Sequence, residues 1–345
     1  MKVDLVGPTP PPLGGVSVHL TRLSARLLAC GHEPVHHNPQ RPGEHLFSTW
    51  SRYRKACVGD LAHIHLRSIF DASFFGMRAR LGHPVVLTLH GEGLARQLQA
   101  ASPLRRAWMR PAIRGVDAII AVNSAIARFA IDTLGFDEGA VHVIPAFLPP
   151  DKETLQETPV PPAIESFLQT HSPVISANAF HLGLDGDVPL YGTDLLLELL
   201  LELRSSHPQA GVLLYVSCEE DHPTVADLRQ VLADAAMTEH YHVVSGSRPF
   251  GPAMVRSSLL VRPTSTDGDA VSIREALTAG VPVVASDVVS RPEGVHAFEY
   301  RDLRSLVDTT RRALDADTPP PSAAIREAGD ETFHQILGVY EDVLG

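Results

Sequence analysis

The segment TSTDGDAVSIREALTAGVPVVASDV, residues 264–288, holds the pattern that decides the fold. The run SLLVRPT just before it reads as a strand, and a helix is predicted from about Val271 to Ala279, where Gly280 ends it. The apolar run PVVASDV then predicts the next strand. Two apolar strands joined by a helix are typical of a parallel sheet that is buried on both faces.

The same alternation runs through both halves of the chain. Before residue 150 the apolar runs are KVDLVGP, EPVHHN, LAHIHLR, PVVLTLH, AIIAVN and VHVIPAF, separated by amphipathic stretches such as SAIARFAIDTLG. The pattern resumes later with SPVISANAF, GVLLYVS and HYHVVSG. We therefore predict an α/β protein with two doubly wound, Rossmann-like domains, whose parallel sheets face a central cleft. Ligands of such domains bind beyond the carboxyl ends of the strands.

The predicted domain boundaries follow changes in composition. Residues 1–150 form an N-terminal Rossmann-like domain, and residues 151–163 form a linker rich in proline and charge. Residues 164–325 form a second Rossmann-like domain, and residues 326–345 form a C-terminal helix that packs back toward the first domain. A chain of 345 residues is also long for a single core.

Charge is distributed unevenly along the chain. Residues 1–150 contain 16 Lys/Arg and 10 Asp/Glu, a net charge of +6, whereas the remainder contains 13 and 30, a net charge of −17. This asymmetry suggests that the first domain faces an anionic partner. The basic residues are scattered and the whole chain carries −11, so a nucleic-acid partner is not expected.

The cysteines and the first residues indicate the compartment. Cys30, Cys57 and Cys218 are odd in number and widely spaced, so they predict neither a disulfide framework nor a zinc site. The start MKVDLVGPTPPP resembles a first strand and not a signal peptide. We expect a cytoplasmic protein. A peripheral contact with the inner membrane face, through the arginine-rich stretch PLRRAWMRPAIRG of the first domain, is left open, although a solvated helix face is the favoured interpretation.

Glycines and histidines mark the first domain. Gly14 and Gly15 stand where the first strand turns into the first helix, and there the backbone N–H groups can approach a phosphate. A tight turn without a ligand explains the pair equally well. His90 follows the strand VVLTLH, and a polar side chain at that strand end favours a functional role. The alternating His63 and His65 resemble half of a metal site, but no third ligand is identifiable, so a structural role is favoured.

Three explanations compete for the carboxylates of the segment 264–288: a metal site, an acid/base pair, or a clamp for a ligand. Asp267 lies in the loop before the predicted helix and Glu275 lies in its first or second turn, so the two bracket a helix N-terminus. A helix N-terminus binds anions, and carboxylates accept hydrogen bonds from pairs of hydroxyls. A ligand with hydroxyls at both ends and phosphates between them fits this arrangement, which favours the clamp and a nucleotide sugar.

The whole chain resembles the GT-B glycosyltransferases of the retaining family 4, the glycogen-synthase-like group. That family carries an E-x7-E motif at a helix start, followed by alanine-glycine-x-proline-valine-valine. Here the motif reads Asp267-x7-Glu275, followed by AGVPVV at 279–284. The loop at Gly14 and Gly15, the HIH strand, His90 and the block AIIAVNSAIARFAIDTLGFDEGAVHVIPAF are similar in order.

The resemblance implies a role for each matched residue. Glu275 would accept hydrogen bonds from the ribose, Asp267 would hold hydroxyls of the transferred sugar, and His90 would lie near the reacting carbon. The donor-binding set, which includes the groups that would hold the diphosphate, would comprise Gly14, Gly15, Asn178, Gly268, Asp269, Ala270 and Val271. The resemblance also implies retention of anomeric configuration and no metal cofactor. Neither Asp267-Gly268-Asp269 nor Asp185-Gly186-Asp187 is then read as a metal-binding D-x-D.

Two departures from the family stand out. The first acid of the motif is Asp267 where the family usually has glutamate, and Gly268-Asp269-Ala270 replaces glycine-phenylalanine-glycine. The second is larger, because the basic pair that neutralises the diphosphate is missing, with Ala179 or Phe180 and Tyr191 near those positions. A clamp of this kind is a major catalytic element. Arg248 and Arg262 are the candidate substitutes, with Arg256 behind them.

Two functions follow from these observations. The favoured one is a retaining hexosyltransferase that uses a nucleotide-diphosphate sugar, with UDP as the expected nucleotide. Its acceptor would be a small molecule, a glycan or a lipid-linked glycan, in glycan, glycolipid or natural-product glycoside biosynthesis. The alternative is a nucleotide-sugar-binding pseudo-glycosyltransferase that acts as a non-catalytic partner, and the missing basic pair motivates it. A sugar epimerase of the same fold fits the D-x7-E block less well.

Overall fold

The computed structural model describes residues 1–10, 14–38, 51, 53–54, 57–65, 68–91, 93–150, 155, 158–217, 222–246, 248–267, 270–316 and 322–345. The chain divides into two compact units. The first comprises residues 1–10, 15–148 and 328–345, and the second comprises residues 11–14 and 149–327. The C-terminal segment therefore belongs to the first unit, and each unit is described by itself below.

The first unit is built on a six-stranded parallel sheet with the order β2-β1-β3-β4-β5-β6. The four middle strands of this sheet are largely apolar and buried, as expected for a parallel sheet covered on both faces, and all six strands are short. They are β1 (Lys2–Val6), β2 (Glu33–His37), β3 (Leu61–Ile64), β4 (Val85–Leu89), β5 (Ala118–Ala121) and β6 (Val141–Val143). The order reverses direction between β1 and β3, which marks a switch point.

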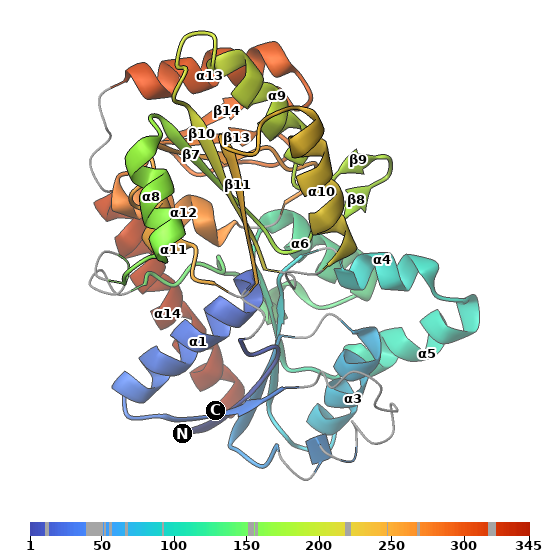
Figure 1. Cartoon of the computed structure of the whole chain (residues 1–345). Helices are drawn as coiled ribbons and strands as arrows, with labels where there is room; N and C mark the ends of the chain where they lie inside the picture. Colours follow the sequence, from blue (N-terminus) through green and yellow to red (C-terminus); the bar gives the residue numbers. More distant parts are fainter. Residues whose placement is uncertain are drawn as a thin grey trace. The chain divides into compact units, whose positions relative to one another are not determined.

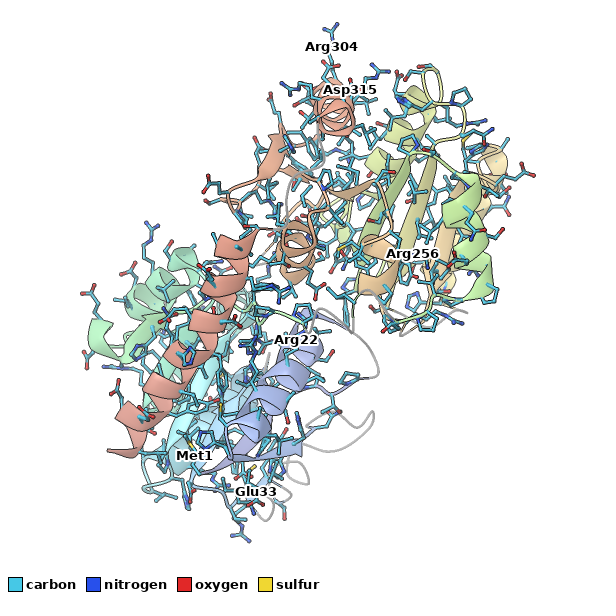
Figure 2. All side chains as sticks on the ribbon, turned by 90° about the vertical axis from the view of Figure 1, so that its left-hand side faces the viewer. Met1, Arg22, Glu33, Arg256, Arg304 and Asp315 are labelled. Atoms are coloured by element: carbon cyan, nitrogen blue, oxygen red, sulfur yellow. The ribbon has the colours of Figure 1, made fainter. Side chains whose placement is uncertain are left out.

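Helices cover both faces of this sheet (Figure 1). They are α1 (Gly15–Ala29), α3 (Ile69–Ala79), α4 (Gly93–Ala100), α5 (Pro103–Ile113), α6 (Ser124–Arg128), continued by a π-helical turn (Phe129–Leu134), a 3-10 turn (Glu138–Ala140) and α14 (Ala323–Leu344). On one face, α14 lies beside α1 in both figures, and Phe333, Ile336 and Tyr340 join the core that Leu20 and Leu23 of α1 form. Arg22 of α1 (Figure 2) holds the end of the segment 15–148, because its Nη1 donates to the carbonyl of Leu148 at 3.0 Å.

The second unit contains a six-stranded parallel sheet with the order β11-β10-β7-β12-β13-β14. Its strands are β7 (Val174–Ala179), β10 (Gly211–Val216), β11 (Tyr241–Ser245), β12 (Leu259–Arg262), β13 (Val283–Ser286) and β14 (Val295–Phe298). Its helices are α8 (Pro162–Thr170), α9 (Thr193–Leu203), α10 (Pro223–Asp234), α11 (Gly251–Met254), α12 (Val271–Ala279) and α13 (Leu303–Asp315). The prediction of two doubly wound sheets is confirmed.

Local signals set most element bounds, and two places differ from the prediction. The helix predicted at Val271–Ala279 is α12, and Gly280 ends it in the left-handed conformation at φ 79°. The final helix begins at Ala323, three residues before the predicted bound of 326, because Ala323 and Ala324 are also good helix formers. The segment after β7, where no strand was predicted from the sequence, contains a small antiparallel hairpin, β8 (Leu184–Asp185) and β9 (Val188–Pro189).

A helix that crosses a membrane is both long and strongly apolar, and the helices of the described ranges do not meet this requirement.

Candidate functional site

The switch point of the second sheet lies between β7 and β12. From there β10 and β11 extend to one side, and β13 and β14 extend to the other. In open parallel sheets, the carboxyl ends of the strands at such a point form the usual ligand site. Asn178 near the end of β7 and Arg262 at the end of β12 stand at this edge, and the loop that carries Asp267 leads from β12 to α12.

Asp267 is the centre of a buried ion-pair network. Its Oδ2 accepts hydrogen bonds from Arg262 Nε at 2.6 Å and from Arg291 Nη1 at 2.8 Å, and its Oδ1 accepts from Arg262 Nη2 at 2.9 Å. The side chains of Arg262, Asp267 and Arg291 are 11%, 6% and 6% exposed. We call these three residues the cationic cluster, because two guanidinium groups surround one carboxylate and leave one positive charge in excess.

The ionisation of the cationic cluster is stable over the physiological range. Burial raises the pKa of the Asp267 carboxyl, but the neighbouring charges of Arg262 and then Arg291 outweigh burial and hold that pKa below its ordinary value. Burial likewise opposes the charge of Arg262, and Asp267 restores it, so the pKa of the guanidinium lies above its usual value. The cluster therefore keeps its excess positive charge.

The cationic cluster is fixed to three strand ends. Arg262 Nη1 donates to the side-chain oxygen of Asn178 at 3.4 Å and to its main-chain oxygen at 3.5 Å. Arg291 Nε donates to the main-chain oxygen of Ser286 at 2.9 Å, and Arg291 Nη2 donates to the hydroxyl of Ser286 at 3.2 Å. The two arginines thus join the ends of β7, β12 and β13 at the carboxyl edge of the sheet.

The helix α12 starts close to the cationic cluster in sequence. Ala270 is its N-cap and Val271 its first residue, and the methyl side chain of Ala270 can accept no hydrogen bond from the first turn. Glu275 lies in the second turn and is 7% exposed. The predicted diphosphate contacts at Gly268 and Asp269 lie outside the described residues.

The sequence expectations for the second unit have mixed outcomes. Asp267 was expected to hold sugar hydroxyls, whereas the structure directs its carboxylate to two arginines. Arg262 is at the site, but Arg248 follows the edge strand β11, is exposed, and is separated from β12 by β10 and β7. Arg256 (Figure 2) pairs with Glu165 on α8. The structure therefore does not bring Arg248 or Arg256 to the cationic cluster.

Arg291 is the residue of the cationic cluster that the sequence did not predict. It lies 24 positions after Asp267, in the segment that follows β13. Position alone could have pointed to it, because the segment after each parallel strand leaves the sheet at the same edge.

The two predicted glycines differ in their surroundings. A Cβ atom on Gly14 would lie 2.8 Å from the ring of Phe180, so close packing alone requires glycine there. Gly15 is the first residue of α1, and a Cβ atom on it would have no neighbour within 4 Å among the described residues. The open surroundings of Gly15 are compatible with a ligand at the start of α1. For Gly14, the close approach of the Phe180 ring explains the glycine without a ligand.

The first unit carries a histidine cluster at its own switch point. His19 lies in α1, His65 directly follows β3 and half-buried His90 directly follows β4. His65 Nδ1 and His90 Nε2 share a hydrogen bond at 2.8 Å. No third ligand beside His63 and His65 was identifiable from the sequence. The structure places the rings of His19 and His90 beside the ring of His65. We call His19, His65 and His90 the histidine cluster.

The second D-x-D sequence has a structural role in the described structure. Asp185 ends β8, and its Oδ2 accepts a hydrogen bond from the hydroxyl of Ser265 at 2.9 Å. Gly186 forms the hairpin turn at φ 62°. The hairpin is thereby attached to the loop that precedes Asp267.

Known proteins resemble this chain in part of its sequence and in its whole fold. Residues 35–152 match the family model described as Glycosyltransferase Family 4. The MMP alpha-(1->4)-mannosyltransferase of Mycolicibacterium hassiacum is 23% identical over 219 residues. That match covers 63% of this chain and 51% of the mannosyltransferase, so it spans about half the length of that relative.

Solved structures of similar fold cover the entire chain. A glycosyltransferase from Rickettsia africae superposes with a TM-score of 0.73 at 13% identity, over 99% of this chain and 98% of that one. HepE from Anabaena, solved with UDP and glucose, superposes with a TM-score of 0.69 at 14% identity, over 99% of this chain and 100% of that one. HepE has also been solved with UDP and with UDP-glucose. The family match therefore covers residues 35–152, and the likeness of fold covers the whole chain.

Proposed function

We propose that this protein is a retaining glycosyltransferase that moves a hexose from a nucleotide-diphosphate sugar to an acceptor bound by the first unit. The observation that carries the proposal is the cationic cluster, which supplies buried positive charge at the strand ends where the diphosphate of a donor would lie. It removes the motive for a non-catalytic pseudo-glycosyltransferase, because the missing basic pair has a replacement in Arg262 and Arg291.

We assign the roles from the charge and position of each group. Arg262 and Arg291 bind the diphosphate and stabilise the charge that grows on it as the glycosidic bond breaks. Asp267 positions both guanidinium groups, and the N–H groups of Ala270 and Val271 at the start of α12 add donors. Glu275 accepts hydrogen bonds from the ribose hydroxyls. His90 lies near the transferred sugar.

The proposed reaction needs no protein base. The acceptor oxygen attacks the anomeric carbon on the same face from which the leaving group departs. The bond between that carbon and the phosphate oxygen breaks. The proton of the acceptor hydroxyl passes to the leaving phosphate, so nucleoside diphosphate and a glycoside of retained configuration are formed. Because arginines carry the charge stabilisation, this reaction is proposed to proceed without a metal ion.

UDP is the proposed donor nucleotide. The support is that HepE, which shares the fold over the whole chain, has been solved with UDP and with UDP-glucose. The acceptor is proposed by class alone, as a small molecule, a glycan or a lipid-linked glycan.

Calorimetric titration with UDP, GDP, dTDP, ADP and UMP, each in the absence and in the presence of EDTA, tests the proposal. We expect UDP to bind in the micromolar range and more tightly than UMP. Arg291→Gln removes a charge-assisted contact of about 1.5–3 kcal/mol, so the preference for UDP over UMP should fall roughly 10–100-fold. Arg256→Gln, which affects an arginine outside the cationic cluster, is the matched control. Binding of no nucleotide, or binding that EDTA abolishes, contradicts the proposed function.

The surface of α5 would suit an acceptor that is bound to a membrane. This helix exposes Leu104 and Trp108 among Arg105, Arg106 and Arg110. Apolar and basic side chains together favour an anionic membrane surface. We expect the protein to sediment with vesicles that contain anionic lipid, and to do so less after Trp108→Ala. Sedimentation that is independent of vesicle charge would argue against this contact.

A further inference from the structure

The histidine cluster has the shape of a metal site. One ring nitrogen from each of His19, His65 and His90 lies within 4.8 Å of the other two. The ring centroids are 5.3 Å apart for His19 and His65, 5.3 Å for His19 and His90, and 5.2 Å for His65 and His90. The three rings therefore form a nearly equilateral triangle around a common centre.

The size of this triangle matches tetrahedral coordination. Zinc binds imidazole nitrogen at about 2.0–2.1 Å, and the ring centre lies roughly 1.1–1.2 Å beyond the nitrogen, so tetrahedral angles place the centroids about 5.2 Å apart. The observed separations agree with this value. The nitrogens of His65 and His90, now 2.8 Å apart, would have to separate by about 0.5 Å to bind one ion.

The orientation of His19 is that of a metal ligand. Its Nδ1 lies 2.7 Å from the carbonyl oxygen of Ala146. A carbonyl only accepts, so Nδ1 carries the proton and Nε2 carries the lone pair. Metal-binding histidines are usually held in this way, with the second ring nitrogen donating to a backbone carbonyl.

Two nitrogens of the cluster have no hydrogen-bond partner within the described part of the chain. They are Nε2 of His19, which is 3% exposed as a residue, and Nε2 of His65, which is 1% exposed. Buried polar atoms are normally paired, so the unpaired Nε2 of His19, the nitrogen that its bond to Ala146 leaves with a lone pair, points to a missing partner.

His63 supports the cluster without being one of its ligands. Its Nδ1 lies 2.5 Å from the hydroxyl of Tyr340 and its Nε2 lies 2.7 Å from the hydroxyl of Thr88, so both ring nitrogens are engaged. The ring of His63 lies against that of His65, with 4.0 Å between their centroids. His63 therefore fixes the ring of His65 from the side of α14.

We propose that His19, His65 and His90 form a binding site for a divalent transition metal of the zinc class, with three imidazole ligands and a fourth position for water. Softness and geometry favour zinc, cobalt or nickel over magnesium or calcium, which take oxygen ligands. The transfer reaction proposed above gives His90 a place near the transferred sugar, but it assigns no step to a metal at this site.

A second group in the same unit, Asp4, His37 and Cys57, is a weaker candidate. Both carboxylate oxygens of Asp4 are used, one by His37 Nε2 at 2.8 Å and the other by the N–H of Gly59 at 2.6 Å. Burial raises the pKa of the Cys57 thiol to about 12, and a thiol binds a metal as the thiolate. This group therefore serves as the control for the experiment.

Titration with Co²⁺ and Zn²⁺ of protein stripped with EDTA tests the site. We expect one equivalent of Co²⁺ to produce the visible absorption of tetrahedral cobalt, and Zn²⁺ to displace it. Loss of one direct ligand should weaken binding by about 100-fold or more, beyond the 10–100-fold typical of outer-shell changes. His19→Gln and His90→Gln should both show this loss, and His37→Gln should bind as the wild type does.

Thermal unfolding provides a second readout of metal binding. It does not require every ligand variant to fold, because the wild type and one folded variant are enough for the comparison. Zn²⁺ should raise the Tm of the wild type and of His37→Gln, since a ligand of the native state stabilises it, and should leave the Tm of His90→Gln unchanged. The proposal is overturned if the wild type shows no saturable 1:1 binding, or if His19→Gln and His90→Gln bind the metal as tightly as the wild type does. No sugar nucleotide is used, so the outcome is independent of the proposed transferase activity.

Discussion

Glu275→Gln is expected to lower the affinity for UDP roughly 10²–10³-fold, because it replaces two charge-assisted hydrogen bonds to the ribose, together worth about 3–4 kcal/mol. Glutamine has nearly the same size, so the buried second turn of α12 should keep its packing. The carboxylate is acceptor-only, whereas the amide of glutamine presents one acceptor and one donor group. Calorimetric titration with UDP measures the change, and the exposed Glu293→Gln is the control.

A comparison of ribose with deoxyribose identifies the contact itself. The wild type should bind 2′-deoxy-UDP much more weakly than UDP, and Glu275→Gln should bind the two nucleotides almost equally. A variant that still prefers UDP to the same degree as the wild type would place the ribose elsewhere. An unchanged affinity for UDP would remove Glu275 from the site altogether.

Asp267→Asn is expected to be the most destabilising single change at the site. It leaves Arg262 and Arg291 buried together without a counter-charge, so the excess positive charge rises from one to two. Removing one partner of a buried ion pair costs about 3–5 kcal/mol of unfolding free energy. Glu165→Gln breaks the partly exposed pair with Arg256, which solvent screens, and should cost far less. Denaturant titration of both variants checks the difference, and equal costs would refute a structural role for Asp267.

The acid dependence of stability gives an independent check on Asp267. The pKa of this carboxyl is lower in the folded protein than the ordinary value of 3.8, so its contribution is complete above that value. The contribution is lost as the pH falls below 3.8 and through the lowered pKa. The wild type should therefore lose this part of its stability on acidification, and Asp267→Asn, which has no such carboxyl, should not. Parallel acid profiles of the two proteins would contradict the assignment.

The sequence predicted the second sheet well wherever local signals were sufficient. The limits of α12 followed from apolar spacing and from Gly280, whose left-handed conformation the helix end requires. Arg262 was named as a substitute for the missing basic pair, together with Arg248, which the structure does not bring to the cationic cluster. Arg291 was missed because its pairing with Asp267 depends on how β13 is placed beside β12, and no local pattern encodes that neighbourhood.

The histidine cluster shows the same limit more clearly. The alternation of His63 and His65 is visible in a single strand, but the other two histidines come from α1 and from the end of β4. Parallel pairing of β3 with β4 brings His65 and His90 together, and the return of α1 over the sheet adds His19. A strand-end rule could have paired His65 with His90, whereas His19 required the three-dimensional path of the helix.

The contribution of α14 to the first unit has a consequence for synthesis of the chain. Residues 15–148 leave the ribosome with the apolar groups of α1 and of the sheet uncovered, until Phe333, Ile336 and Tyr340 emerge. About 180 residues, from 148 to 328, are made in between, which takes roughly 9–36 s at 5–20 residues per second. During that time the nascent first unit presents an open apolar face, so we expect this to be the interval in which the chain is most prone to aggregate.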